Sequence, residues 1–429
     1  MNPGTYYAAS AGPAPAPAPA RDALRGRVDA QVCVIGGGFA GLATAIGLIE
    51  RGVRDVVILE GETVGHGASG RNGGFVFGGF SLDNAQLLAD LGSVAARAMY
   101  ELTRAAVTTI RRRIGQYGIA CDAVEGGVVL ANWFDDDAIL RRRQEFMARE
   151  FDVHWQLLSH DELGDYARSR RYAGGLLEPD AFHFHPLKYA RGLATAVAHA
   201  GGRIFENARV TRIVAPRTPG GSHEVHTKDG VVDARHVVVA GGGYLRGLSP
   251  PIERAMLPIA TYVIATEPLG AALRASIPGR AAIYDTRFSF DYYRALPDTR
   301  ILWGGRISIL DRGPAPIARL LKRDMLKVYP ELRDVKVDYA WGGLMSYARH
   351  QMPQIGRLPD GTWHALGFGG HGVGPTTAAG ELLADAIAGG VPIPLGFERY
   401  GLDRVWGAAG MLAAQAKYNW YEFKDWMNG

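Results

Sequence analysis

Cysteine is scarce in this chain, with only two among 429 residues. Two cysteines cannot form the disulfide framework of small secreted domains, and no Cys-x-x-Cys or Cys/His cluster has the spacing of a metal site. Cys33 lies inside an apolar run, which is typical of a packed, inert thiol. His183 and His185 flank Phe184 in a predicted loop, and we interpret them as structural. The sequence therefore predicts no metal.

A large excess of either charge is also lacking, because 47 basic residues nearly balance 43 acidic ones and the net charge is +4. Such a balance does not call for a nucleic-acid partner. The basic runs Arg111–Arg113 and Arg141–Arg143 stand in mixed-charge helical stretches, and we interpret both as solvated helix faces.

Long hydrophobic runs are missing as well, since none reaches the roughly 18–20 apolar residues that a membrane-spanning helix requires. The N-terminus has no charged start followed by an apolar segment, so it does not resemble a secretory signal. Residues 13–20, after Gly12, instead alternate Pro and Ala, which predicts a solvated, polyproline-like and disordered tail over residues 1–27. We expect a cytoplasmic protein.

Glycine, in contrast, is abundant, with 57 residues, and the first glycine cluster interrupts a strand–helix–strand pattern. Strands are predicted over residues 32–35 and 56–59, joined by a helix over 39–51. Gly-x-Gly-x-x-Gly stands between the first strand and the helix, which is the context that makes this motif informative. The alternative interpretation is a glycine turn in an ordinary βαβ unit.

The residues of this turn suit a dinucleotide. Gly36 permits a tight turn, Gly38 lets a pyrophosphate approach the helix N-terminus, and Gly41 lets the helix pack closely on the sheet. Glu60 ends the second strand, nineteen residues after Gly41, where a carboxylate binds ribose hydroxyls and favours FAD or NAD over NADP. The predicted cofactor contacts of this unit are Gly36, Gly38, Phe39, Ala40, Gly41 and Glu60.

A second glycine-rich stretch, residues 65–75, is too rich in glycine for a regular element. Such a loop can pass a flat ligand and donate backbone N–H groups to it, whereas the alternative is a mobile surface loop. The cofactor contacts predicted here are Ser69, Arg71, Asn72, Gly73 and Gly74.

Two later glycine clusters follow the same logic. An apolar strand over residues 231–240 ends in three glycines, and residues 369–374 lead into a helix over 375–388. A helix N-terminus delivered by such a turn stabilises an anionic or electron-rich group. The further predicted cofactor contacts are Gly241, Gly370, Gly372, Val373 and Gly374 of these clusters, together with Val210.

The remaining elements predict a second domain. A helix over residues 84–118, broken near Gly92, has no nucleotide-binding features. From residue 250 the pattern changes to alternating strands that form an antiparallel sheet with one buried face. These strands are expected over residues 262–267, 281–286, 290–295 and 300–306, before a helix over 315–329.

The order of elements predicts an α/β chain, α+β overall, with a Rossmann-like dinucleotide-binding domain and a second domain on an antiparallel sheet flanked by helices. The nucleotide-binding domain is predicted to be discontinuous, over residues 28–85, 165–250 and 340–395, and the second domain to take 86–164 and 251–339. Residues 396–429 are expected to form a helical, aromatic tail over the core or another subunit.

These pieces resemble the FAD-dependent amine and amino acid oxidase superfamily, which includes D-amino acid, glycine and sarcosine oxidases. The resemblance covers residues 28 to about 390. It is most specific at Gly36–Gly41 with Glu60, in the Ser69–Gly74 loop and in the Gly369–Gly374 turn. Within it, the gamma-glutamylputrescine oxidase branch is most similar at Gly70–Gly74, Trp341–Met345, Met352–Gly356 and Gly401–Trp420.

The resemblance implies FAD held across the first domain, with the flavin ring beneath the antiparallel sheet and residues 370–374 at its pyrimidine end. It also implies oxidation of the C–N bond of an amine by hydride transfer to flavin N5, imine hydrolysis and reoxidation by O2 or another acceptor. The alternatives are an N-methyl or amino acid oxidase, a dehydrogenase, and a flavoprotein subunit with structural FAD. An oligomer is compatible with each.

Three departures from the superfamily pattern narrow the prediction of substrate, flavin linkage and electron acceptor. Glycine-type members place a carboxylate-clamping arginine after Gly-Leu, whereas Met345 follows here, which favours an amine or N-substituted amino compound. The cysteine that binds flavin covalently in sarcosine-type members is missing, so FAD is expected to be non-covalent. The lysine over the flavin has no match either, so O2 as acceptor follows from the family. The substrate candidates are Trp341, Met345 and Arg349, and the catalytic candidates are Tyr293, Arg306 and His371.

Overall fold

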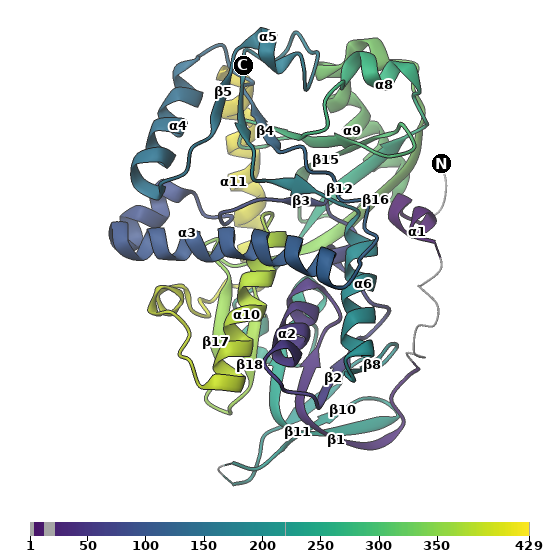
Figure 1. Cartoon of the computed structure of the whole chain (residues 1–429), viewed down its shortest axis with the longest axis vertical. Helices are drawn as coiled ribbons and strands as arrows, with labels where there is room; N and C mark the ends of the chain where they lie inside the picture. Colours follow the sequence, from purple (N-terminus) through teal and green to yellow (C-terminus); the bar gives the residue numbers. More distant parts are fainter. Residues whose placement is uncertain (1–3, 13–21, 219, 429) are drawn as a thin grey trace.

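The computed structural model describes residues 4–12, 22–218 and 220–428, and two eight-stranded sheets form its frame. In Figure 1 the first sheet occupies the lower half of the molecule and the second sheet the upper half. Helix α3 (Asn84–Gln116) runs across the junction between them. Within the described residues, no helix is both long and apolar enough to cross a bilayer.

The first sheet has the parallel core that the sequence predicts. The central strands are nearly continuous apolar runs because helices cover the sheet, as in other parallel sheets. Strand β17 pairs antiparallel at the edge, and a hairpin of β9 (Arg212–Val214) and β10 (His223–His226) joins β11. The main strands, in spatial order, are β17 (Gln354–Arg357), β18 (Trp363–Leu366), β11 (Gly230–Val239), β1 (Gly26–Ile35), β2 (Val56–Leu59) and β8 (Arg203–Phe205).

Three helices pack beside this sheet, and two of them approach each other closely. Helices α2 (Phe39–Glu50) and α10 (Val373–Gly389) meet at Gly380, where a side-chain carbon would come within 2.6 Å of Ala43. Helix α6 (Pro186–His199) packs against α2 on its other side. Helix α2 ends at Glu50, one residue before the end of the predicted helix over 39–51.

The second sheet is antiparallel, as expected, except at one parallel pair between β13 and β4. Helix α9 (Pro314–Val328) packs against its β16 and β12 strands. The strands, in spatial order, are β16 (Val337–Tyr347), β12 (Leu257–Thr266), β15 (Ile301–Ser308), β14 (Tyr292–Ala295), β13 (Ala282–Asp285), β4 (Val128–Ala131), β6 (Gly175–Glu178) and β5 (Gln156–Leu158). The remaining helices are α4 (Ala138–Phe151), α5 (His160–Leu163), α7 (Pro250–Glu253), α8 (Ala271–Ser276) and α11 (Gly407–Asn428).

Two domain boundaries differ from the prediction. Strand β6 lies within the predicted nucleotide-binding segment 165–250, yet it pairs with β4 and β5 of the second sheet. Strand β16 pairs with β12 from Val337 to Tyr347 and so carries the second sheet past residue 340. Both boundaries are decided by pairing between strands far apart in the sequence, and such pairing cannot be predicted from composition alone.

The N-terminus is not the solvated tail that was predicted for all of residues 1–27. Helix α1 (Tyr6–Ser10) packs Tyr6 and Tyr7 into the protein, and the Tyr7 hydroxyl donates to the Asn72 carbonyl at 2.8 Å. Two adjacent aromatic rings bury enough apolar surface to hold this short segment in place. The Ala/Pro stretch over residues 13–20 lies outside the described residues.

Helix α3 breaks at Gly92 as predicted, with φ 76° and ψ 166°, but its basic run is not a solvated face throughout. Arg113 is fully buried and binds Glu50 at 2.7 Å and Glu381, which joins α3 to α2 and α10. Burial alone would raise the pKa of Glu50, but hydrogen bonds from Arg113 and Arg112 outweigh it and lower the pKa to about 2.

Replacing Arg113 with Met should lower the free energy of unfolding by about 3 kcal/mol, because it leaves two carboxylates at the helix junction without their shared cation. Arg112→Met is the matched control, since the Arg112 side chain is 47% exposed and its pair with Glu50 contributes at most about 1 kcal/mol. Urea unfolding at pH 7 measures both, and equal losses would contradict the assignment.

The Arg113→Met deficit should also depend on pH. The folded-state pKa of Glu50 lies below its ordinary value of 4.5, so the stabilisation is present above pH 4.5 and is lost as the pH falls toward 2. The difference between wild type and variant should therefore shrink over that window.

Candidate active site

One cavity of about 940 Å³ extends from the β1–α2 turn to the second sheet. Its volume is at the upper end of the range for small-molecule sites, about 300–1,000 Å³. Each glycine cluster singled out in the sequence contributes to its wall, namely residues 36 and 38, 67–69 and 71–73, 241–243 and 369–374.

The β1–α2 turn has the geometry that its glycines predict. Gly36 adopts φ +115°, and a side-chain carbon there would lie 2.7 Å from the Ala240 carbonyl. A side-chain carbon at Gly41 would overlap the Gly36 carbonyl oxygen, so Gly41 sets the approach of α2 and does not line the cavity. The first N–H of α2, on Phe39, donates to Ser69 Oγ at 2.8 Å.

Glu60 lies at the end of β2 with its carboxylate at the cavity wall. The carboxylate accepts hydrogen bonds from Gly37 N at 2.6 Å and from Glu62 N at 2.9 Å. These bonds hold its position without neutralising its charge. Val210 and Gly241 complete this end of the cavity.

The loop over residues 65–74 is ordered by its own side chains. Asn72 Nδ2 donates to the carbonyls of Ala68 and Ser69, and its Oδ1 accepts from Gly74 N at 2.8 Å. Arg71 donates to the His66 and Gly342 carbonyls, at 2.7 and 3.1 Å. The side chains of Asn72 and Arg71 thus lock the loop, while Gly73 faces the cavity and Gly74 closes against Phe184.

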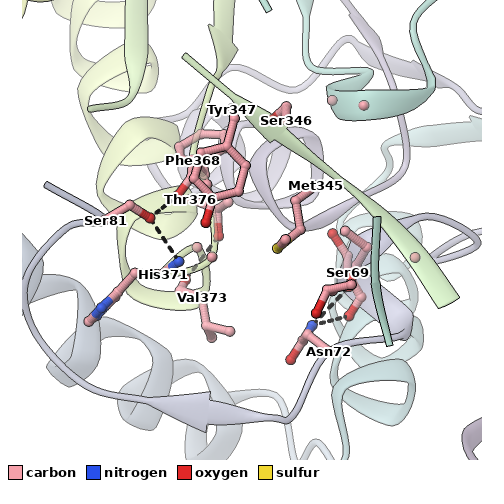
Figure 2. A pocket seen from close by; sticks show the side chains of 18 of the residues that line it. Ser69, Asn72, Ser81, Met345, Ser346, Tyr347, Phe368, His371, Val373 and Thr376 are labelled. Atoms are coloured by element: carbon pink, nitrogen blue, oxygen red, sulfur yellow. Dashed lines mark hydrogen bonds between the residues drawn. The ribbon is translucent and has the colours of Figure 1, made fainter. Parts of the chain in front are cut away.

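The turn before α10 is held by a serine that the sequence analysis did not single out. Ser81 Oγ accepts from His371 N at 3.1 Å and donates to the Phe368 carbonyl at 3.1 Å. Figure 2 shows this bridge and, beside the same pocket, Met345 on strand β16. The turn brings Gly370, Gly372 and Val373, and with them the positive end of the helix dipole, to the cavity.

His371 lies in the cavity wall, as predicted. Its ring packs on Phe77 with 4.0 Å between ring centroids, and its Nε2 is 3.4 Å from the Phe77 carbonyl. Burial lowers the pKa of His371 to about 4, so the imidazole is neutral near pH 7.

Three of the predicted catalytic and substrate residues do not reach the cavity. Tyr293 is fully buried and stacks on Trp303 at 4.4 Å, whereas its neighbour Tyr292 lines the cavity, because alternate residues of a strand face opposite sides of the sheet. Trp341 lies behind the 65–74 loop and donates to the Arg71 carbonyl at 3.0 Å. Arg349 lies over the Trp406 ring at 5.3 Å, away from the cavity.

Arg306 does line the cavity, but its charge is already neutralised. Its guanidinium binds both carboxylate oxygens of Asp324, at 2.5 and 3.0 Å, and Glu422 at 3.0 Å. Because Glu422 belongs to α11, Arg306 also fastens the C-terminal helix to the second sheet.

Helix α11 supplies cavity residues that the sequence analysis missed. Tyr418, Tyr421 and Asp425 line the cavity, and Asp425 accepts from the backbone N–H groups of Phe288 and Ser289. The signal was present as a helical spacing of polar and aromatic residues along the tail. The tail therefore covers the core of its own chain, one of the two placements considered.

The residues present fit FAD. The cavity is continuous between the dinucleotide turn and the start of α10, and bare glycine backbone faces it at both ends. A carboxylate for ribose hydroxyls stands at one end, and a helix N-terminus for an electron-rich ring stands at the other. The fold and site thus define a dinucleotide-binding flavoprotein.

Comparison with known proteins agrees with this class. Residues 31–386 match the DAO family, FAD dependent oxidoreductase. The chain is 38% identical to gamma-glutamylputrescine oxidoreductase of Escherichia coli (strain K12), over 90% of this chain and 89% of that protein. It is 33% identical to "Probable oxidoreductase OrdL" of Haemophilus influenzae, over 92% of each. The crystal structure of glycine oxidase from Geobacillus kaustophilus shares the fold, with a TM-score of 0.72 over 89% of this chain and all of that chain, at 22% identity. The protein belongs to the DAO family of FAD-dependent oxidoreductases, which confirms the resemblance.

Gly41→Ala should abolish FAD retention, because the added carbon overlaps the Gly36 carbonyl and displaces α2 from the turn. Gly115→Ala is the matched control, since a side-chain carbon there meets nothing within 4 Å in helix α3. The flavin-to-protein absorbance ratio after purification measures the outcome, with circular dichroism to establish folding. A folded Gly41→Ala variant with full flavin content would contradict this role.

Proposed function

We propose that this enzyme oxidises the C–N bond of an amine that carries no α-carboxylate beside the reacting carbon, of the gamma-glutamylputrescine type. The observation that carries the proposal is the position of Met345, which lines the cavity on β16 opposite the turn before α10. A methionine cannot clamp a carboxylate. The similarity to the E. coli gamma-glutamylputrescine oxidoreductase supports the same class.

Three arginines among the predicted site residues could in principle bind a carboxylate, but none is free to do so in the cavity. Arg71 is bound within its loop, Arg306 is bound by two carboxylates, and Arg349 lies outside the cavity. An α-amino acid therefore meets no free guanidinium at these three positions. An amine without an α-carboxylate does not need a guanidinium partner.

The residues that would hold FAD follow from the cavity wall. Glu60 would bind the ribose hydroxyls, and Gly36, Gly38 and the start of α2 the pyrophosphate. Residues 370–373 and the α10 dipole would face the electron-rich end of the ring. The bound flavin supplies the two-electron oxidation of the C–N bond, water hydrolyses the resulting imine, and O2 or another acceptor takes the electrons.

The chain itself contributes orientation and exclusion of water. Tyr418 and Tyr421 of α11 close the cavity on the side of the second sheet. His371 is neutral near pH 7, so it can donate or accept a hydrogen bond without adding positive charge that would repel a cationic amine.

A cytoplasmic location and an oligomeric assembly stay predictions.

FAD should be bound without a cysteinyl link. The two cysteines, Cys33 and Cys121, are buried and lie outside the cavity wall. Acid precipitation should therefore release all of the flavin into the supernatant, which absorbance of the supernatant measures. Flavin that stays with the pellet would contradict this expectation.

Anaerobic addition of gamma-glutamylputrescine to the purified holoenzyme should bleach the flavin band near ~450 nm, because the cofactor reports its own reduction. Glycine and D-alanine should leave the band unchanged at the same concentration. Readmission of air separates an oxidase, which recovers its colour, from a dehydrogenase, which does not. If no amine bleaches the flavin, the alternative of a structural FAD is favoured.

A further inference from the structure

The cavity continues beyond the flavin-binding segments into a compartment that the proposed function leaves unexplained. Helices α3 and α4 and strands β4, β6 and β13 form its wall. Aromatic rings line the way into it, with His371 to Phe77 at 4.0 Å and Phe77 to Tyr284 at 5.7 Å between ring centroids. We call this space the far compartment and define it by Tyr100, Arg143, Glu178 and Tyr284.

Glu178 is the acidic group of the far compartment. It ends strand β6 and lines the cavity, and its Oε1 accepts one long hydrogen bond, from Gly78 N at 3.4 Å. Among the described residues it forms no ion pair. Burial raises the pKa of Glu178 to about 7, although the Gly78 hydrogen bond and the charge of Arg143 act in the opposite direction. An unpaired carboxylate in such a place is costly unless a ligand pairs with it.

Arg143 is the basic group of the far compartment. It belongs to α4 and lines the cavity at a solvent-exposed position, and its guanidinium carbon lies 5.8 Å from the centre of the Trp155 ring. The part of the chain that the structure describes gives it no hydrogen bond and no carboxylate partner. Its charge acts to lower the pKa of Glu178, and the two residues line the same cavity without forming an ion pair within the described residues.

Two hydroxyl groups complete the set. Tyr100 and Tyr284 line the same compartment, and neither hydroxyl has a hydrogen-bond partner within the described ranges. The compartment thus offers a carboxylate, a guanidinium group and two phenols, and none of them forms an ion pair within the described residues. A simple cation would meet the repulsion of Arg143, and a simple anion that of Glu178. A group that carries both charges satisfies both residues.

We propose that the far compartment binds a zwitterionic α-amino-acid head at the end of the substrate remote from the oxidised amine. Glu178 binds its ammonium group, Arg143 its carboxylate, and the hydroxyls of Tyr100 and Tyr284 bind either group. This inference rests on the proposed function and specifies its substrate as an amine joined to an amino-acid head. It also assigns a role to the end of the Arg141–Arg143 run.

Four substrates with the same aminobutyl end test the assignment one group at a time. Gamma-glutamylputrescine carries both charges of the head, N-glutarylputrescine lacks the ammonium, N-(4-aminobutyryl)putrescine lacks the carboxylate, and N-acetylputrescine lacks both. In the wild-type enzyme, removal of either group should lower kcat/KM at least about tenfold, the effect of losing one charge-assisted hydrogen bond.

The variants should lose this discrimination selectively. Glu178→Gln keeps an acceptor for Gly78 N and should cost gamma-glutamylputrescine about tenfold or more in KM, while N-glutarylputrescine is affected little. Arg143→Gln should show the reverse selectivity, with N-(4-aminobutyryl)putrescine affected little. Arg141→Gln, an exposed residue of the same helix outside the cavity wall, is the matched control and should change none of the four.

Binding without turnover provides an independent readout. Gamma-glutamylbutylamine has the same head but no terminal amine to oxidise, and calorimetry with the oxidised holoenzyme measures its dissociation constant. Glu178→Gln and Arg143→Gln should each weaken binding about tenfold or more, and Arg141→Gln should not. Flavin content and melting temperature establish that each variant is folded.

The outcomes separate this inference from the proposed function. If amines reduce the flavin but the variants affect all four substrates equally, or none, the far compartment is not the head-group site and amine oxidation stands. If no amine reduces the flavin, the proposed function fails and this substrate assignment fails with it, even where calorimetry shows head-group binding to Glu178 and Arg143.

Discussion

The close approach of backbone to backbone at the β1–α2 turn is the constraint on which the rest of this structure depends. Helix α2 can reach the turn only because Gly41 has no side chain to meet the Gly36 carbonyl, and α10 can lie against α2 only because Gly380 leaves Ala43 uncovered. The two helices in turn place their N-termini at the same cavity. The same kind of steric requirement, a glycine where two backbones meet, therefore creates both the nucleotide-binding end and the positively polarised end of the site.

Charge pairing decides which cationic side chains are free to act. Arg113 is used to join three helices, Arg306 to fasten α11, and Arg287 to hold Asp285 and Asp291 together. Arg71 is bound to carbonyl groups within and behind its loop. In the far compartment, Glu178 and the exposed Arg143 line the cavity without an ion pair within the described residues, and they are the groups to which we assign the substrate head.

Local patterns predicted the strand–turn–helix–strand geometry of the first unit, because each of its steric requirements is carried by neighbouring residues. The cofactor contacts of these residues stay predictions. Gly36, Gly38, Gly41 and Glu60 all derive their roles from the backbone within one strand–turn–helix–strand unit. Substrate-side predictions were less successful. Tyr293 was chosen where Tyr292 faces the cavity, because which face of β14 looks inward depends on packing against Trp303 and α9. Trp341 and Arg349 lie outside the cavity wall because they contact partners distant in sequence, the Arg71 carbonyl and the Trp406 ring.

The sequence by itself determined the family, the dinucleotide turn, the acid after β2, the glycine turn before α10 and the presence of a second, largely antiparallel sheet. These features need only short-range spacing and side-chain chemistry. Tertiary structure alone decided that α11 closes the cavity, that Tyr6 and Tyr7 pack inside, and that Glu178 and Arg143 face one compartment from different elements. Such contacts join residues far apart along the chain, and their burial and pairing depend on how the two sheets and their helices pack together.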